Sequence, residues 1–316
     1  MKTIVFGATG YLGSHVAEQL ALAGHHVVCV VRSGSNTGFL QTLPVTIVRA
    51  DFNQVAALAE PIEQDAVVLN CIADTRMHIS DDERRKVECE LTSRVFAAAQ
   101  QAAARRFIQL STVMAYGFER PRHAIDETFP VKPNYGYSRI AREREQTLLA
   151  QYQNGGTELV ILRPSNTLGK RDSSALPALL ASHEKGMFAV IGGGAWQFSC
   201  MDSRDTGRAM VHLLDVPVSK PEIFLAKGYD ISWLDVKGGL DALLQRETKV
   251  MNIPKPLAML LGRVMEAVYP YGKNPMLTRF NVEVLSTHTL FDDAKIRATG
   301  FQPRYDLAAT LGDALS

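Results

Sequence analysis

The chain has 316 residues, of which 46% are hydrophobic and 21% are charged. This composition is that of an ordinary soluble globular protein, and the length is enough for one large domain or for a domain with an appendage. The formal net charge of +1 gives no bulk electrostatic attraction to nucleic acid or to an anionic membrane, and no nucleic-acid partner is expected. No apolar run is long enough to span a membrane, and a strand expected from residue 2 leaves no room for a signal peptide.

The cysteines and histidines give no sign of a metal site. Cys29, Cys71, Cys89 and Cys200 share no metal-type spacing, and the histidines form neither HxxxH nor HExxH. We therefore expect buried, reduced thiols, which fit a cytoplasmic location, and no bound metal.

The first half of the chain alternates between short apolar runs and helical patterns. Strands are expected at 2–6, 26–31, 45–50, 65–73, 107–111 and 157–163, and helices at 11–24, 81–106 and 135–152. Continuous apolar strands separated by helices predict a parallel sheet covered on both faces, which is a doubly wound α/β fold.

The pattern loosens after about residue 170. Helices are expected at 174–186, 205–215, 232–245 and 255–272, and a strand at 222–227. The helix at 255–272 is apolar but carries Arg263 and Glu266. It suits a packed helix or a lid over an apolar pocket, and a membrane-surface helix is the alternative. We assign residues 1–170 to a cofactor-binding Rossmann domain and 171–316 mainly to a substrate-binding region, with 198–228 and 286–292 returning to the first domain.

The stretch "GATGYLG" at residues 7–13 lies between the first strand and the first helix. Glycines in a GxxGxxG spacing permit a tight turn and let backbone N–H groups approach a pyrophosphate, which then faces the helix N-terminus. The turn predicts a dinucleotide cofactor. Its expected contacts are Gly7, Thr9, Gly10, Tyr11, Leu12 and Gly13.

The end of the second strand distinguishes the two nicotinamide dinucleotides. A cofactor without a 2′-phosphate usually meets Asp or Glu there, but this chain has Arg32, and no acidic residue occurs between Glu18 and Asp51. A guanidinium can pair with a 2′-phosphate in a fork, so we expect NADP(H) rather than NAD(H). A solvated loop arginine is the alternative.

Several further stretches, with the glycine turn, resemble the extended short-chain dehydrogenase/reductase family of NAD(P)-dependent epimerase/dehydratase type. They are "ADFNQ", "VVLNCIA", "FIQLSTVMAYG", "IDETFPVKPNYGYSRIARE", "VILRPSNTLG", "MDSRDTGRAM" and "FDDAKIRATGFQPRY". The stretch "NPMLTRFNVEVLS" at 274–286 is similar to the branch with 3β-hydroxysteroid dehydrogenases and dihydroflavonol-4-reductase-like enzymes.

The resemblance implies roles for residues at the ends of the strands. Asp51 would bond the adenine, and Phe52 would lie against its ring. Ala73 would lie beside the cofactor, and the loop from Pro164 to Asn166 near the nicotinamide. These contacts are what the family pattern implies for this sequence.

The stretch "YGYSRIARE" resembles the helix that carries the family's catalytic tyrosine. A tyrosine hydroxyl, whose pKa is ordinarily about 10, can exchange a proton with substrate oxygen if that pKa is lowered. Tyr135 and Arg139 lie one helical turn apart, so we expect Tyr135 to be the acid/base, Arg139 the cation and Thr112 the orienting donor. Tyr137 is the other candidate, but Ala141 follows it one turn later.

Arg139 stands where the family has lysine. Arginine keeps the charge and can bond both ribose hydroxyls, but it is effectively always protonated and so is a poor proton relay. The cofactor should still bind, and turnover is expected to be slow.

Taken with the apolar second half, these residues predict an NADP(H)-dependent oxidoreductase. It would reduce a carbonyl or oxidise a secondary alcohol of an apolar small molecule. A nucleotide-sugar epimerase or dehydratase with tightly bound NAD is the first alternative, and a dinucleotide-binding regulator with little catalysis is the second. The resemblance also allows a homodimer through the helices at 84–100 and 135–149.

Overall fold

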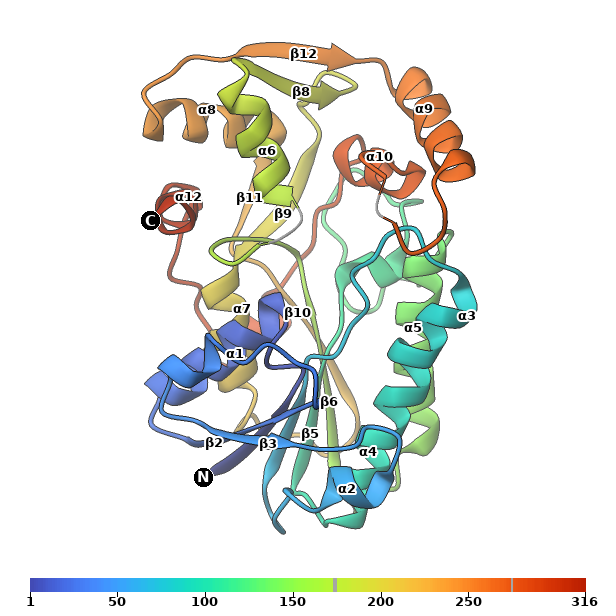
Figure 1. Cartoon of the computed structure of the whole chain (residues 1–316), viewed down its shortest axis with the longest axis vertical. Coiled ribbons are helices and arrows are strands. Elements are labelled where there is room, and N and C mark those ends of the chain that lie inside the picture. The colour runs from blue at the N-terminus through green and yellow to red at the C-terminus, as the bar shows by residue number, and fades with distance from the viewer. Residues whose placement is uncertain (173–174, 274) are drawn as a thin grey trace.

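The computed structural model describes residues 1–172, 175–273 and 275–316 (Figure 1). In these residues the largest sheet is parallel and has the strand order β10-β6-β5-β4-β1-β2-β3. Its strands are β1 (Lys2–Phe6), β2 (His26–Val31), β3 (Thr46–Arg49), β4 (Val67–Asn70), β5 (Arg106–Leu110), β6 (Glu158–Pro164) and β10 (Glu222–Ala226). The predicted doubly wound α/β fold is confirmed.

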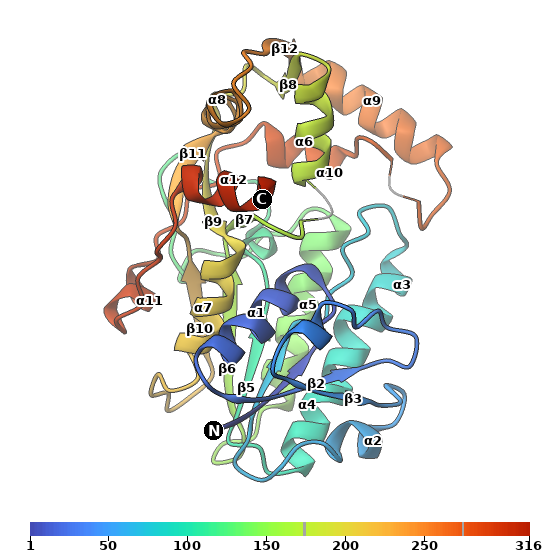
Figure 2. The same ribbon diagram turned by 60° about the vertical axis from the view of Figure 1, so that its left-hand side comes forward.

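Helices cover both faces of this sheet (Figures 1 and 2). One face carries α1 (Tyr11–Leu22), α7 (Ser203–His212) and α11 (Ala294–Ala298), and the other carries α2 (Val55–Ala59), α4 (Thr92–Gln101) and α5 (Gly136–Gln151). Successive strand residues point to opposite faces. Val5 therefore packs in the core under α1, whereas Ile4 and Phe6 pack in the core under α4. This two-sided burial is why the strands are continuously apolar.

The helix expected at 81–106 is divided and ends earlier. It comprises α3 (Asp81–Arg85), a π-helical turn (Lys86–Leu91) and α4, which ends at Gln101. Arg106 is instead the first residue of β5 and is buried. Its guanidinium donates to Glu158 at 2.6 Å and to the carbonyl oxygens of Leu213 and Leu214, so a charged residue can occupy a buried strand.

The second half contains more strands than the sequence predicts. Strands β7 (Asn166–Leu168), β9 (Gln197–Asp202) and β11 (Tyr229–Ser232) form one small sheet, and β8 (Met187–Ile191) pairs with β12 (Lys249–Ile253). The helices here are α6 (Ala175–Glu184), α8 (Trp233–Leu243), α9 (Lys255–Val268), α10 (Arg279–Leu285) and α12 (Leu307–Leu315). Ser174 and Asn274, which belong to predicted segments, lie outside the described residues.

The helix expected to start near Ser232 is confirmed as α8. The Ser232 hydroxyl accepts from the Asp235 N–H at 3.2 Å, and the Asp235 carboxylate accepts from the Ser232 N–H at 2.7 Å. This capping box satisfies two N–H groups that would otherwise have no partner, and so fixes the helix start.

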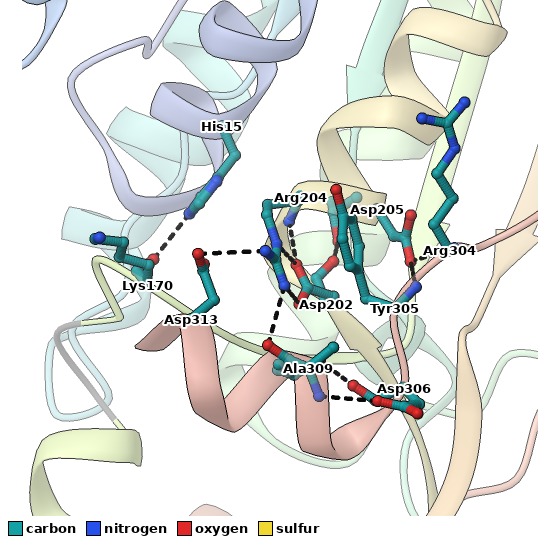
Figure 3. A network of polar contacts seen from close by, with 12 residues as sticks. His15, Lys170, Asp202, Arg204, Asp205, Arg304, Tyr305, Asp306, Ala309 and Asp313 are labelled. Carbon is teal, nitrogen blue, oxygen red and sulfur yellow. Dashed lines mark hydrogen bonds and ion pairs between the residues drawn. The ribbon is translucent and has the colours of Figure 1, made fainter. Parts of the chain in front are cut away.

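A polar network fastens the C-terminal segment to the Rossmann part (Figure 3). Arg204, at the start of α7, pairs with Asp202 and with Asp313 of α12, and its guanidinium carbon lies 3.7 Å from the centre of the Tyr305 ring. Asp205 accepts from the N–H groups of Arg304 and Tyr305 at 2.9 and 3.0 Å. The last helix is therefore held to the same α7 that packs on α1.

The contact between α7 and α1 is very close. A Cβ added to Gly207 would lie 2.7 Å from the carbonyl oxygen of His15, so only glycine permits this approach. His15 also contacts the loop after β7, because its Nε2 lies 2.8 Å from the carbonyl oxygen of Lys170 (Figure 3). The helix that begins at the glycine turn is thus held by two separate segments of the chain.

The four cysteines are free thiols. Cys29 and Cys200 are buried, as expected, and burial raises the pKa of each to about 12. Cys71 and Cys89 are only half-buried, contrary to expectation, because Cys71 follows the end of β4 and Cys89 lies in the π-helical turn.

Candidate active site

The glycine turn joins β1 to α1 at the carboxyl edge of the central sheet. Gly7 has a φ of +78°, and a Cβ there would lie 2.7 Å from the carbonyl carbon of Cys71 on the neighbouring strand. A Cβ on Gly13 would lie 2.1 Å from the carbonyl oxygen of Gly7. Both positions therefore require glycine if the helix is to start this close to the strand.

The N-terminus of α1 suits an anion. Its N-cap residue, Gly10, makes no side-chain cap, and the first turn contains no acidic residue. The first N–H groups of a helix lack intrahelical partners and carry a partial positive charge. A pyrophosphate placed here would satisfy those groups, so this cradle fits the dinucleotide that the turn predicts.

A cavity of about 610 Å³ lies beyond the ends of β2 and β3. Its charged and aromatic lining residues are Arg32, Arg49, Asp51, Phe52, Lys86, Glu90 and Arg94. Arg49 also stabilises the loop after β2, because its guanidinium donates to the carbonyl oxygens of Arg32 and Ser33 at 3.1 and 2.6 Å. Sequence analysis identified Arg32, Asp51 and Phe52, but it missed the three other cations.

Asp51 and Phe52 lie together directly after β3. The Asp51 carboxylate accepts from the Asn53 N–H at 2.9 Å, from the Asn53 amide at 3.0 Å and from the Gln54 amide at 3.0 Å. The backbone hydrogen bond and the amide donors hold the pKa of this exposed carboxyl below its usual range. The Phe52 ring meets Phe6 edge-on at 6.0 Å, so one wall of the cavity is anchored in the sheet core.

Thr112 follows β5 and is tightly oriented. Its Oγ1 accepts from the Met114 N–H at 3.1 Å, which fixes the position of this oxygen. Ala73 follows β4, Pro164 ends β6 and Asn166 begins β7, so these predicted residues occupy the same edge of the sheet as the glycine turn. The Asn166 amide is engaged, because it donates to the Ser199 carbonyl oxygen at 3.3 Å.

Tyr135 is the N-cap residue of α5 and contacts two aromatic rings. The ring centroids of Phe118 and Phe280 lie 5.7 and 5.9 Å from its own. Burial, and next the charge of Glu283, raise the pKa of Tyr135 above its ordinary value. The structure therefore does not have the lowered pKa that was expected from Arg139, whose guanidinium instead pairs with Asp81 at the start of α3.

The structure brings Thr112 together with Tyr137. The Tyr137 hydroxyl lies near the Thr112 side chain. Burial, and next the charge of Glu88, raise the pKa of Tyr137, while the cations Arg144 and Arg84 and the Thr112 contact oppose that rise. The Tyr137 environment was missed because its charges come from residues far from it in the sequence.

Both tyrosines line a second cavity of about 440 Å³. Residues of α9 and α10 also line it, including Arg263, Glu266 and Phe280. The Phe280 ring lies 5.2 Å from that of Tyr137, so it contacts both tyrosines. Of the roles expected for the helix at 255–272, the structure favours the one that places it beside a pocket.

A buried charge network lies beneath Thr112. Glu145 accepts from Arg163 at 2.8 and 2.5 Å and from the Ser111 hydroxyl at 2.7 Å, and Arg144 pairs with Glu88. Burial alone would raise the pKa of Glu145, but the Arg163 and Ser111 hydrogen bonds hold it below its usual range. The sequence "ARERE" at 141–145 gives no sign of this burial, since it resembles an exposed helix face.

Replacing Glu145 with glutamine tests this network. Because the folded-state pKa of Glu145 is lowered, its stabilisation exists above the unfolded pKa of about 4.3 and is lost as the pH falls through the folded-state pKa. Glu145→Gln should lower the free energy of unfolding by about 3 kcal/mol at pH 7. The difference from wild type should shrink below about pH 4 in urea titrations.

Glu90→Gln is the matched control. Glu90 pairs with Arg94 at 3.4 Å on the surface, where the side chains are 55% and 35% exposed. This change should cost less than about 0.5 kcal/mol at any pH. Equal decreases in the free energy of unfolding for Glu145→Gln and Glu90→Gln would contradict the role assigned to Glu145.

Comparisons with known proteins agree with the observed fold. The family model described as "NAD dependent epimerase/dehydratase family" matches residues 3–226. A farnesyl-dihydroquinoline-oxide ketoreductase from Stigmatella aurantiaca is 26% identical over 96% of this chain and 92% of its own length. The N-acetylglucosaminyl-diphospho-undecaprenol 4-epimerase of Escherichia coli O157:H7 is 23% identical over 98% and 93%. The structure of UDP-glucuronic acid 4-epimerase from Bacillus cereus with NAD has a TM-score of 0.79 and 20% identity, and the match covers 99% of this chain and 97% of that one.

Proposed function

The chain belongs to the NAD dependent epimerase/dehydratase family, and on that premise we propose that it is an NADP(H)-dependent oxidoreductase that reduces a carbonyl or oxidises a secondary alcohol of an apolar small molecule. The observation that carries the proposal is the cation-rich cavity beyond the ends of β2 and β3, at the sheet edge where the glycine turn also lies. Bound across the turn, the cofactor would supply or accept a hydride.

The preference for the phosphorylated cofactor rests on charge. Arg32, Arg49, Lys86 and Arg94 converge on the cavity where the adenosine end of a dinucleotide would lie. Asp51 is already engaged by Asn53 and Gln54. A 2′-phosphate would therefore meet guanidinium groups, which bind phosphate in a bidentate manner.

We assign proton exchange to Tyr135 and orientation of the substrate oxygen to Thr112. Tyr135 holds the position that the family pattern gives to the acid/base, and its ring lines the second cavity. The Thr112 hydroxyl, fixed by the Met114 N–H, would donate to the same oxygen. Tyr137 would help to position Thr112, because its hydroxyl lies near that side chain.

Arg139 is assigned the role of the nearby cation. The Arg139 and Asp81 side chains are 44% and 38% exposed, so water screens their ion pair. Breaking this pair costs less than about 1 kcal/mol. Arg139 would then be free to bond the ribose hydroxyls and to lower the pKa of Tyr135. Because arginine does not release its proton, the outward relay would need water.

The apolar substrate is supported by the names of two relatives and by the aromatic part of the second cavity. Phe280, Ala267, Tyr271 and Ile79 contribute apolar surface there, beside the charged Asp81, Arg84, Arg263, Glu266 and Arg279. Two of the relatives act on molecules whose names contain a farnesyl or an undecaprenol group. An isoprenoid or sterol-like carbonyl compound is the substrate class that these features favour.

Replacing Arg32 tests the cofactor preference. Arg32→Gln should raise the Kd for NADPH by about 10- to 100-fold, because a charge-assisted phosphate contact is lost. The Kd for NADH should change less than about threefold. Both are measured by fluorescence titration.

Arg105→Gln is the control for that change. Arg105 is a surface arginine next to β5 at the opposite edge of the sheet, where it pairs with Asp215 at 3.2 Å. It should leave both Kd values unchanged. An equal loss of NADPH and NADH binding in Arg32→Gln would contradict the proposed phosphate contact.

The two tyrosines are distinguished by a matched pair of substitutions. Tyr135→Phe should lower the rate of hydride transfer by about 10²- to 10⁴-fold in stopped-flow assays with a panel of apolar ketones. Tyr137→Phe should lower it by less than about tenfold, because only the support of Thr112 is lost. The reverse order would assign the acid/base role to Tyr137.

An epimerase or dehydratase that retains NAD is the second candidate, favoured by the names of the undecaprenol 4-epimerase and of the NAD-containing 4-epimerase structure. Purified protein that carries stoichiometric NAD would select it. Tight NADPH binding without turnover on any ketone would instead select a dinucleotide-binding regulator.

A further inference from the structure

Helix α9 presents most of its large apolar residues to solvent rather than to the protein. Its buried residues are the small Ala258 and Gly262, and a Cβ on Gly262 would lie 3.0 Å from the backbone nitrogen of Arg279. The large apolar side chains Leu257, Leu260, Leu261, Val264 and Val268 are 40–74% exposed. A surface helix ordinarily turns its apolar stripe toward the core, so this arrangement is reversed.

The exposed residues form one surface. Leu257, Leu261, Val264 and Val268 follow each other at helical spacing, so they form a single stripe along α9. Val250 and Met251 on the preceding β12, and Tyr269, Tyr271 and Met276 after the helix, are also exposed. Figures 1 and 2 show β12 and α9 together at the end of the molecule farthest from the N-terminus. We call this set of residues the α9 surface, and contiguous apolar surfaces of this kind mark interaction sites.

The α9 surface is flanked by positive charge. Residues 246–273 contain five basic side chains and two acidic ones, although the whole chain has a net charge of only +1. Glu266 is neutralised by Arg279 at 2.6 Å. Within the described parts of the chain, the ion pairs leave Lys249, Arg263 and Lys273 without a carboxylate partner.

Charge distinguishes two partners that could cover this surface, a second copy of the chain and an anionic lipid bilayer. A second copy related by a two-fold axis would place the same cations against each other, which is unfavourable. An anionic lipid surface is complementary to them, and exposed Leu, Val and Tyr side chains suit the boundary between headgroups and acyl chains. No helix in the described residues is long and apolar enough to span a bilayer.

We propose that α9 docks flat on an anionic membrane, with the α9 surface inserted roughly 5–10 Å into the interface. Arg263, Glu266 and Ala267 of α9 also line the second cavity, so docking brings the cavity to the lipid. The entry of an apolar substrate from the bilayer rests on the proposed function. The docking of α9 on the membrane does not depend on that function.

The test is sedimentation of the purified protein with lipid vesicles, without cofactor or substrate. Vesicles of phosphatidylcholine and phosphatidylglycerol should bind the wild type, and pure phosphatidylcholine should bind it at least about tenfold more weakly. Leu260→Glu should reduce binding to the mixed vesicles by at least about tenfold. Arg263→Gln with Lys273→Gln should reduce it by about tenfold and leave little lipid selectivity.

Leu22→Glu is the matched control. Leu22 is 75% exposed at the end of α1, away from the α9 surface, so the same substitution should leave binding and thermal stability unchanged. Failure of the wild type to bind the mixed vesicles, or equal effects of Leu260→Glu and Leu22→Glu, would overturn the proposal. A dimer in light scattering that Leu260→Glu dissociates would overturn it in favour of a second copy.

The vesicle test is independent of the proposed enzyme activity, because it measures binding without turnover. If both hold, Leu260→Glu should retain its rate on a water-soluble ketone and lose rate only on a substrate presented in vesicles. Leu260 is not among the residues that line the cavity.

Discussion

The close approach of Gly13 to the carbonyl oxygen of Gly7 is the constraint on which the site depends. It lets α1 begin directly beside β1, so that the uncapped N-terminus of the helix opens at the carboxyl edge of the sheet. Every other element of the site reaches the same edge, because the strands of the central sheet are parallel. The close packing of α7 on α1 through Gly207 and the network around Arg204 hold this helix in place.

Charge is distributed unequally along this edge. At the β2 and β3 end, Arg32 and Lys86 of the first cavity have no carboxylate partner among the described residues, although Arg94 pairs with Glu90. At the β5 end, the cations Arg144 and Arg163 are committed to Glu88 and Glu145 inside the protein. The first arrangement can recruit an anion, whereas the second fixes the position of Thr112 and Tyr137 without offering a free charge.

The sequence predicted the central sheet well because its strands are buried on both faces and its turns contain glycine. Strands β1 and β2 were found with their exact bounds, and Ser232 was identified as a helix start. Of the strands in the small sheets, β7 was missed because it has only three residues, and β12 because four of its five residues are exposed. Within the site, the position of Arg32 follows from the chain alone, but its neighbours Lys86 and Arg94 come from a helix that sequence cannot place beside it.

The contacts around the two tyrosines also could not be predicted from the sequence. The spacing of Tyr135 and Arg139 is visible in the sequence, yet the pairing of Arg139 with Asp81 and the contact of Tyr137 with Thr112 depend on how α3, α5 and the loop after β5 pack. The position of the Arg139 guanidinium therefore does not follow from its spacing in the sequence. It pairs with Asp81 on α3, and the pKa of Tyr135 is raised rather than lowered.

The most direct test of the whole account is hydrogen–deuterium exchange with and without NADPH. NADPH should slow the exchange of the backbone amides at residues 7–13 and at the ends of β2 and β3, because the helix N-terminus and the first cavity would hold the cofactor there. Unchanged exchange in both segments at saturating NADPH would contradict it.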